Sequence, residues 1–156
     1  MKFCSKCGAR LEEYCLNGSY KACLMCNERY YDNPIVGVAV VYLKGNKILL
    51  GKRSSSYKTG KWCIPCGYLE SHEDVKEGAR REFKEETSLD VQDLKLLDVK
   101  SNTNKTVGVY YLAGEVSGEL KADDDLSEVG FYNLGDLPEM AFKSDLKIIK
   151  ELQKIE

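Results

Sequence analysis

Apolar and polar positions along the chain form segments that predict both strands and helices. Residues 35–42 are β-branched or apolar throughout, and they are bounded by Pro34 and by Gly45-Asn46, so we expect a buried strand there. Residues 47–53 predict a strand that returns beside it as a hairpin, followed by a polar loop over 54–61. Further strands are expected at three places: 96–100, 107–116 and 129–134.

Two segments have the pattern of helices. The first covers residues 74–87, where Asp74 followed by Glu77 is typical of an N-terminal cap. The second begins near Ser144, our expected cap, and repeats apolar residues at helical spacing: Leu146, Ile149, Leu152 and Ile155. Strands and helices that alternate in this mixed order favour a layered α+β or α/β domain.

The first 30 or so residues differ from the rest. They are rich in cysteine and too short to build an apolar core, and Asp32-Asn33-Pro34 marks a natural boundary. We therefore expect two domains, residues 1–32 and residues 33–156.

Two Cys-x-x-Cys pairs occupy the first domain. Cys4 and Cys7 are separated from Cys23 and Cys26 by 15 residues, a spacing that fits a tetrahedral zinc site. Bound zinc would supply the missing core. The alternative is that the four cysteines form two redox or disulfide pairs, which a reducing cytosol disfavours. Cys15 lies off this pattern.

Composition excludes few functions. Of the residues, 43% are hydrophobic and 31% charged, as in ordinary globular proteins, and the net charge is -2. This balance gives no reason to expect a nucleic acid or a membrane as partner. The longest apolar run, 35–42, is too short to span a bilayer. Cys4 and Cys7 lie where a signal peptide would need apolar residues, so we expect a cytoplasmic protein.

The first expected helix carries three acidic residues on one flank. At 3.6 residues per turn, Glu82, Glu85 and Glu86 fall within a sector of roughly 100°, beside the apolar Ala79 and Phe83. Crowded carboxylates repel one another unless a cation lies among them, and oxygen ligands of this kind suit Mg²⁺ or Mn²⁺. A solvated acidic surface helix is the alternative that composition alone would favour.

The spacing decides between these alternatives, because the segment resembles the Nudix box, G-x5-E-x7-R-E-U-x-E-E-x-G-U. The residues that match in register are Gly67, Glu73, Arg81, Glu82, Phe83, Glu85, Glu86 and Leu89. Ser88 stands where the family usually has glycine, at a helix end that needs positive φ. The preceding stretch Trp62-Cys-Ile-Pro-Cys66 is similar to the Trp-x-x-Pro-Gly that often leads into the box.

The resemblance implies an α/β/α sandwich with a mixed sheet, preceded by the zinc ribbon. It implies that Glu82, Glu85 and Glu86, with the carbonyl of Gly67, bind Mg²⁺ or Mn²⁺. The catalytic set would also include two orienting residues, Glu73 and Arg81, and one glutamate would help to deprotonate the attacking water. Nudix enzymes often add an acid from a later loop. Glu128 is the candidate here, and a solvated loop acid explains it equally well.

A zinc ribbon followed by a Nudix domain resembles two branches of the family, the NADH pyrophosphatases and shorter enzymes acting on ADP-ribose or FAD. The NADH branch usually carries a Ser-Gln-Pro-Trp-Pro-Phe-Pro-x-Ser signature, which this chain lacks. Residues 137–142 instead resemble the Leu-Ala-Phe segment of the second branch. Phe142 and Tyr68 are candidates to stack on a substrate ring, and Arg53 is a candidate to meet its phosphates; core packing and solvation are the alternatives.

We therefore expect an enzyme that splits the pyrophosphate bond of ADP-ribose or FAD, a small nucleotide substrate. An NADH pyrophosphatase and a nucleoside-triphosphate pyrophosphohydrolase are the rival enzymes. A non-catalytic binding module is the rival of another class, and the three retained glutamates argue against it. Because many Nudix enzymes pair, analogy alone favours a homodimer.

Overall fold

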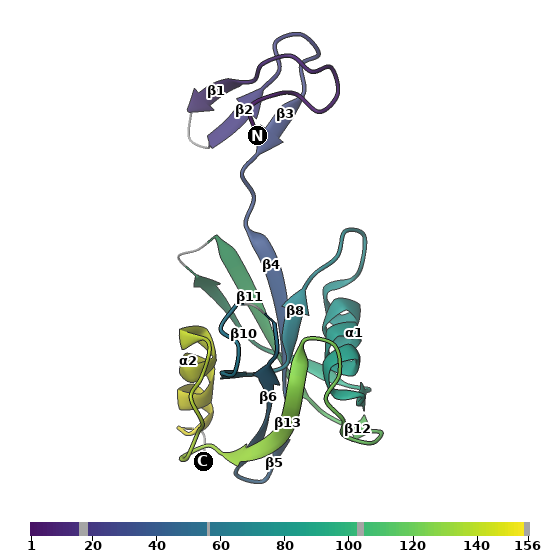
Figure 1. Cartoon of the computed structure of the whole chain (residues 1–156), viewed down its shortest axis with the longest axis vertical. Helices are drawn as coiled ribbons and strands as arrows, with labels where there is room; N and C mark the ends of the chain where they lie inside the picture. The colour runs from purple at the N-terminus through teal and green to yellow at the C-terminus, as the bar shows by residue number, and fades with distance from the viewer. Residues whose placement is uncertain (16–18, 56, 103–104, 155–156) are drawn as a thin grey trace. The chain divides into compact units, whose positions relative to one another are not determined.

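A computed structural model describes residues 1–15, 19–55, 57–102 and 105–154 (Figure 1). The contacts divide the chain into two compact units, Met1–Pro34 and Ile35–Glu156. Among the described residues, no helix is long and apolar enough to cross a lipid bilayer.

The first unit is a small antiparallel sheet with two similar turns. Its strands pair in the order β1-β2-β3, with these bounds: β1 Glu12–Cys15, β2 Ser19–Ala22 and β3 Arg29–Tyr31. In one turn the N–H of Gly8 donates to the carbonyl of Cys4 at 2.9 Å, and in the other the N–H of Asn27 donates to Cys23 at 2.8 Å. Gly8 and Asn27 have φ of 76° and 58°, so each turn closes through the left-handed region.

The second unit contains the remaining strands and both helices. Its elements are β4 Ile35–Val41, β5 Leu43–Lys44, β6 Lys47–Arg53, β7 Trp62–Cys63, β8 Cys66–Tyr68, α1 Val75–Thr87, β9 Asp90–Val91, β10 Leu94–Asn102, β11 Thr106–Ala113, β12 Val116–Ser117, β13 Leu126–Asn133 and α2 Lys143–Leu152. One sheet has the order β10-β11-β4-β8, in which β11 and β4 are parallel and the other pairs antiparallel. A second sheet has the order β13-β6-β5, with β7 also paired to β6, and β12 pairs with β9.

Strand β4 carries apolar residues on both faces because each face is covered by a helix. Val38 and Val40 pack in one cluster with Phe83 of α1. Val41, on the opposite face, packs in another cluster with Ile148 of α2. Figure 1 shows α1 and α2 on opposite sides of the strands. The predicted α+β class with a mixed sheet is confirmed, and the continuous apolar run over β4 is explained by burial on both faces.

The predicted hairpin of residues 35–42 and 47–53 is wrong over most of its length. Strand β4 pairs with β11 and β8, whereas β6 pairs with β13, β5 and β7. Only at the turn does the N–H of Leu49 donate to the carbonyl of Tyr42, at 2.9 Å. The two strands diverge because each is an interior strand with partners on both edges.

The start of the last helix also differs from the prediction. α2 begins after Phe142, whose side chain makes no capping hydrogen bond, and Ser144 lies buried inside the first turn. The buried apolar face uses Ile148 in addition to Ile149 and Leu152, because the helix contacts the core with a wider stripe than the predicted spacing. The predicted Ile155 lies outside the described residues.

Candidate active site

Helix α1 is fixed at both ends by its own residues. Asp74 caps its N-terminus by accepting a backbone N–H of the first turn at 2.9 Å, as predicted. Glu77 does not complete a capping box and pairs with Arg80 at 2.5 Å. At the other end, Ser88 has φ 61° and donates its N–H to the carbonyl of Lys84 at 2.8 Å. Serine therefore adopts the left-handed turn for which glycine is usual.

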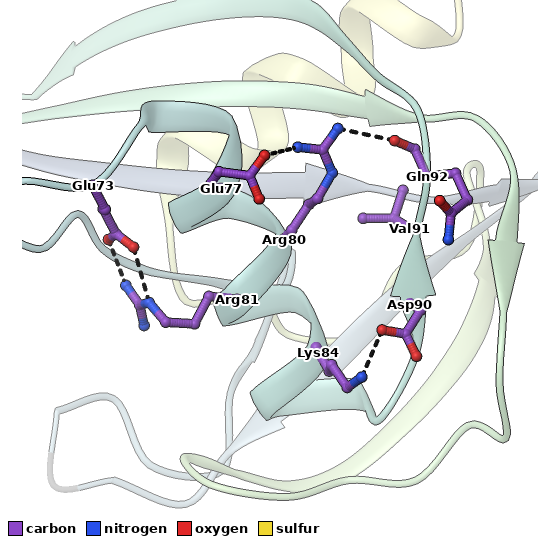
Figure 2. A pocket seen from close by; sticks show the side chains of 8 residues that line it. All are labelled: Glu73, Glu77, Arg80, Arg81, Lys84, Asp90, Val91 and Gln92. Carbon is purple, nitrogen blue, oxygen red and sulfur yellow. Dashed lines mark hydrogen bonds and ion pairs between the residues drawn. The ribbon is translucent and has the colours of Figure 1, made fainter.

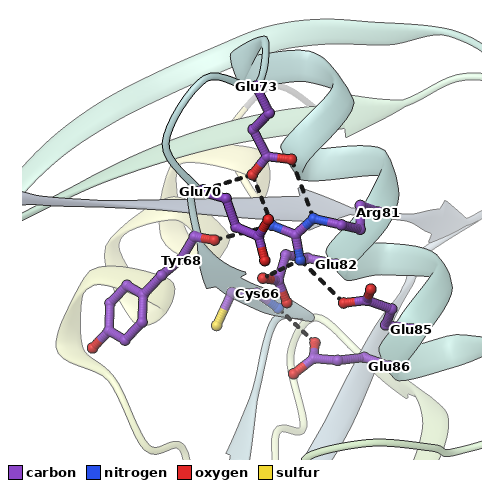
Figure 3. Close-up of polar contacts among 8 residues, drawn as sticks. All are labelled: Cys66, Tyr68, Glu70, Glu73, Arg81, Glu82, Glu85 and Glu86. Atoms are coloured by element: carbon purple, nitrogen blue, oxygen red, sulfur yellow. Dashed lines mark hydrogen bonds and ion pairs between the residues drawn. The ribbon is translucent and has the colours of Figure 1, made fainter.

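Arg81 holds several carboxylates of the site (Figure 3). Its Nε and Nη2 donate to the two carboxylate oxygens of Glu73 at 3.1 and 2.8 Å. Its Nη1 donates to Glu82 at 2.8 Å and to Glu85 at 3.1 Å, and Nη2 also reaches the carbonyl of Tyr68 at 3.1 Å. The Arg81 hydrogen bonds lower the pKa of Glu73. Arg81 thus ties the loop before the helix and strand β8 to the glutamates of α1.

Gly67 lets a carboxylate approach the backbone of β8. A Cβ placed at Gly67 would lie 1.9 Å from Oε2 of Glu82, so no other residue fits there while Glu82 keeps its position. Two of the predicted metal-binding positions are therefore neighbours in space although they are 15 positions apart in sequence. Burial raises the pKa of Glu82, because a charged carboxylate loses water in this position.

Glu86 is the most deeply buried acid of the helix, with 1% of its surface exposed. Its Oε2 accepts the backbone N–H of Cys66 at 2.7 Å. Burial raises the pKa of Glu86 well above its ordinary value, and one hydrogen bond does not offset the lost hydration. A bound cation would favour the ionised form of this carboxylate.

The three glutamates lie along one flank of α1, as the spacing predicted (Figure 3). Their surroundings differ, because the Glu85 side chain is 47% exposed and that of Glu82 only 14%. These features fit a hard divalent cation, which prefers oxygen ligands. The site offers the carboxylate oxygens of the three glutamates, among them the buried Glu86, and the backbone of Gly67 beside Glu82.

A hollow of about 450 Å³ lies along the other flank of α1, between the helix and β9 (Figure 2). Its charged residues are largely paired with one another: Arg80 with Glu77 at 2.5 Å, and Lys84 with Asp90 at 2.7 Å. Paired surface charges of this kind give little attraction for an anionic substrate. Glu73 and Arg81 also line the hollow, so it adjoins the Arg81 network, but Glu82, Glu85 and Glu86 are not among its lining residues.

Two acids outside α1 have different contacts. Glu128, which we expected in a loop, lies in strand β13, whereas Asp124 lies in the loop before it. Glu128 is 57% exposed and forms an ion pair with Lys52 at 2.7 Å. The loop over 121–125 is hydrogen-bonded to the C-terminal end of α1, and Asp124 in this loop contributes to the raised pKa of Glu82. Sequence reasoning passed over Asp124, although three consecutive aspartates in this loop were the available signal.

The candidate substrate-binding residues are only partly brought together. Tyr68 is 62% exposed and does not stack on Phe142. In the described chain, the ring beside Phe142 is that of Tyr57, at a centroid distance of 6.5 Å. Arg53 lies over the Phe142 ring at 5.3 Å, and Lys58 lies over it at 4.9 Å. No sequence pattern pointed to Tyr57 or Lys58, because both lie in a polar loop.

A second buried acid, Asp145, was also missed. It accepts the backbone N–H of Ile64 at 3.0 Å and the hydroxyl of Tyr110 at 2.8 Å. Burial raises the pKa of Asp145 to about 6. In the sequence it has the pattern of an ordinary first-turn acid, and only the packing of α2 on the sheet buries it.

The four N-terminal cysteines converge, with all their sulfur atoms within 4.8 Å of one another. Sγ of Cys4 lies 3.5 Å from Cys26, and Sγ of Cys7 lies 3.4 Å from Cys23. Four thiolates at the tetrahedral Zn–S distance would have sulfur atoms about 3.8 Å apart. The Tyr30 hydroxyl lies 3.0 Å from Sγ of Cys4 and lowers the pKa of this thiol to about 6. The thiols therefore fit a zinc ion.

The comparisons with known proteins agree with this geometry. The NUDIX domain family matches residues 33–152. An ADP-ribose pyrophosphatase of Methanocaldococcus jannaschii is 37% identical over 131 residues, covering 81% of this chain and 77% of the relative. A NAD-capped RNA hydrolase NudC of Vibrio atlanticus is 30% identical over 90% of this chain, which spans 52% of that relative. Among solved structures, a NUDIX hydrolase from Nitrosomonas europaea matches with a TM-score of 0.86, 28% identity and coverage of 99% of this chain and 91% of the other.

These matches support the predicted enzyme class, a Nudix pyrophosphohydrolase. The family match covers most of the second unit, including the whole of α1 and the glutamates it carries. On this match and on the relative from M. jannaschii, the chain belongs to the NUDIX domain family.

Proposed function

We propose that this protein hydrolyses the pyrophosphate bond of a nucleoside diphosphate derivative, with ADP-ribose or FAD preferred. The relative named ADP-ribose pyrophosphatase, 37% identical over most of both chains, supports this substrate class. The observation that carries the proposal is the carboxylate site itself, where Glu82 lies against Gly67 and Glu86 is buried beside it.

The proposed roles follow from the contacts. Glu82, Glu85 and Glu86, with the carbonyl of Gly67, would hold Mg²⁺ or Mn²⁺. Arg81 would keep Glu82 and Glu85 in position and neutralise part of their charge before a cation binds.

Glu73 supports the site indirectly. Its carboxylate accepts two hydrogen bonds from Arg81 and one from the backbone N–H of Glu70 at 2.6 Å. We assign it the role of orienting Arg81. Loss of Glu73 would leave the guanidinium free to move away from the other glutamates.

In the proposed reaction, water attacks one phosphorus of the pyrophosphate and the bridging P–O bond breaks. With ADP-ribose the products are AMP and ribose 5-phosphate. A bound divalent cation neutralises charge on the phosphates and lowers the pKa of bound water. One glutamate of α1 accepts the proton of the attacking water, and the buried position of Glu86 limits access of bulk water.

A hydrolysis screen tests the substrate class. Purified protein is offered ADP-ribose, FAD, NADH, diadenosine polyphosphates and nucleoside triphosphates with Mg²⁺ and then with Mn²⁺. We expect the highest kcat/KM for ADP-ribose or FAD. A higher value for NADH would reverse the ranking, and hydrolysis of none of them would favour the non-catalytic binding module.

A second candidate function is supported by the NudC relatives. They are named NAD-capped RNA hydrolases, and the match to the V. atlanticus protein extends over 145 residues. NAD-capped RNA therefore belongs in the same screen. The missing NADH-branch signature argues against this candidate.

We further propose that residues 1–32 form a zinc ribbon and residues 33–156 the hydrolase domain. The converging thiols of Cys4, Cys7, Cys23 and Cys26 support zinc binding. Thiolate ligands require a reducing compartment, which supports the cytoplasm as location. Metal analysis should find about one zinc per chain. The expected homodimer stays a prediction, which light scattering on purified protein tests.

A further inference from the structure

Tyr30 belongs to the first unit and lies at its cysteine cluster. Side chains alternate along strand β3, so that Arg29 and Tyr31 are exposed while Tyr30 between them is partly buried. The Tyr30 side chain packs against the small cluster that contains Cys4 and Leu11. Pairing of β3 with β2 therefore places Tyr30 beside a thiol that is 26 positions away in sequence.

The Tyr30 hydroxyl contacts two neighbouring residues of the first turn. Its oxygen accepts the backbone N–H of Ser5 at 3.2 Å and lies 3.2 Å from Oγ of the same residue. It lies closer to Sγ of Cys4, at 3.0 Å. A tyrosine hydroxyl has one proton and can also accept, so the N–H of Ser5 leaves that proton free for another partner. The geometry therefore allows the hydroxyl to donate to Sγ of Cys4.

This hydrogen bond should be strongest when Cys4 is in its metal-binding form. Cysteine binds metals as the thiolate, which has no proton, so the Tyr30 hydroxyl can then only donate. Hydrogen bonds to an ionised acceptor are roughly twice as strong as neutral ones. Because the Tyr30 side chain is itself held by packing and by Ser5, the bond also fixes the position of Sγ.

The four thiols differ in their exposure. Cys4 and Cys23 are buried, Cys26 is partly buried and Cys7 is exposed. A reagent from solvent therefore meets Cys7 before it meets Cys4, which Tyr30 also contacts. Cys7 can serve as an internal reference for any effect that is specific to Cys4.

We propose that Tyr30 supports the zinc site through Cys4, because its hydroxyl donates to this thiolate, holds it in place and lowers its reactivity. Residues that hydrogen-bond to a metal ligand typically change metal affinity by roughly 10- to 100-fold when they are lost. The same hydrogen bond engages an electron pair with which the sulfur would attack an electrophile. This inference rests on the proposed zinc ribbon for the identity of the metal.

The zinc affinity of the full chain tests the role of the hydroxyl. Competition with a chelator of known affinity, in the presence of a thiol-free reductant, measures the dissociation constant for zinc. We expect Tyr30→Phe, which keeps the ring and removes the hydroxyl, to raise this constant by roughly 10- to 100-fold. Tyr31→Phe removes a hydroxyl from the exposed neighbour and is the matched control. An unchanged constant in Tyr30→Phe would overturn the inference.

Alkylation distinguishes an effect on Cys4 from a general loosening of the unit. Trypsin separates the two cysteines of the first turn, because Cys4 lies in peptide 3–6 and Cys7 in peptide 7–10. Zinc-saturated protein is treated with iodoacetamide, and mass spectrometry measures the rate at each cysteine. We expect Tyr30→Phe to raise the ratio of the Cys4 rate to the Cys7 rate about tenfold, since a hydrogen bond to a charged group contributes at that level. Equal acceleration at both cysteines would mean that Tyr30 only packs, against the inference.

A second variant separates the hydroxyl from the ring. Tyr30→Leu removes both, so it should weaken zinc binding at least as much as Tyr30→Phe does. If Tyr30→Leu weakens zinc binding and Tyr30→Phe binds zinc like wild type, the ring alone acts and the inference is wrong. Wild-type protein that binds no zinc would refute the ribbon and this inference together. Neither measurement uses turnover, so a failure of the proposed hydrolysis leaves the test intact.

Discussion

The two units of this protein bury very different side chains. In the first unit the buried hydrophobic residues are Cys4, Leu11 and Cys23 among those described. In the second, two apolar clusters lie on either side of β4 and β6 and receive a helix each. A unit with one buried leucine cannot offset the conformational entropy of folding by apolar burial, whereas the second unit can. Under our proposal, zinc bound by the four cysteines would stabilise the first unit as apolar packing stabilises the second.

The same difference explains how each unit uses buried polar groups. In the first unit the thiols form its centre, and their ionised forms would be stabilised by zinc. In the second unit Glu86 and Asp145 are buried in a core that is already stable, and the pKa of each is raised by burial. Such a core tolerates unfavourable charges at a functional site.

Removing zinc should have the largest effect, and only on the first unit. Cys23→Ser, or treatment with a strong chelator, should unfold this unit, because zinc binding contributes roughly 10 kcal/mol in small zinc domains. NMR spectra should lose the dispersed signals of residues 1–32 while those of the second unit stay. Cys15→Ser, which changes a cysteine outside the four, is the control. If the first unit stays folded without zinc, our view that a metal replaces apolar packing in this unit is wrong.

Changing Glu86 to glutamine should separate function from stability in the second unit. The glutamine keeps an oxygen that accepts the Cys66 N–H but carries no charge. We expect kcat to fall by a factor of about 100 or more, because the cation that stabilises the transition state loses a ligand. Without metal, the variant should be at least as stable as wild type in denaturant unfolding, since a buried charge is removed.

Glu77→Gln is the matched control for this experiment, since Glu77 is an exposed acid of the same helix that pairs with Arg80. Near-wild-type hydrolysis by Glu86→Gln would show that the glutamate does not bind the catalytic metal.

Asp145→Asn should reveal the destabilising effect of a buried carboxylate. Its pKa is raised from 3.8 to about 6, so its neutral form favours the folded state at low pH. This advantage is lost as pH rises from about 4 through 6, and wild type should lose up to about 3 kcal/mol of unfolding free energy that the variant keeps. Urea unfolding near pH 4.5 and pH 7.5 measures the difference. Asp136→Asn, which changes an exposed aspartate, is the control. If the difference in unfolding free energy between wild type and Asp145→Asn is the same at both pH values, the raised pKa of Asp145 is contradicted.

The smallest effect concerns Asp124, in the loop over 121–125, and Glu128, in strand β13. Asp124→Asn should lower kcat about tenfold if this loop assists the site, since a single favourable charge interaction contributes at that level. Asparagine tolerates the φ of 49° at this position. Glu128→Gln should have a smaller effect, because Glu128 pairs with Lys52. If Glu128→Gln lowers kcat more than Asp124→Asn does, Glu128 is again the candidate for the additional acid of the site.

Local sequence determined helix α1 well. Its Asp74 cap, its left-handed end at Ser88 and the flank that carries the glutamates all depend on residues within one or two helical turns. The beginning of α2 was less predictable, because tertiary packing places Phe142 before the helix and buries Ser144. Strand positions were also predictable, but their partners were not. Pairing of β4 with β11 joins residues about 70 positions apart, a long-range contact that periodicity does not encode.

The sequence by itself determined the chemistry that the chain carries: four cysteines at metal spacing, and glutamates at the spacing of a Nudix box. Tertiary structure decided which residues meet them. Gly67 lies against Glu82, the loop of Asp124 lies at the end of α1, and Tyr57 lies beside Phe142 because strands and loops far apart in the chain pack together. Spacing along a helix is fixed by its 3.6-residue turn, whereas contacts between elements depend on the packing of the whole core.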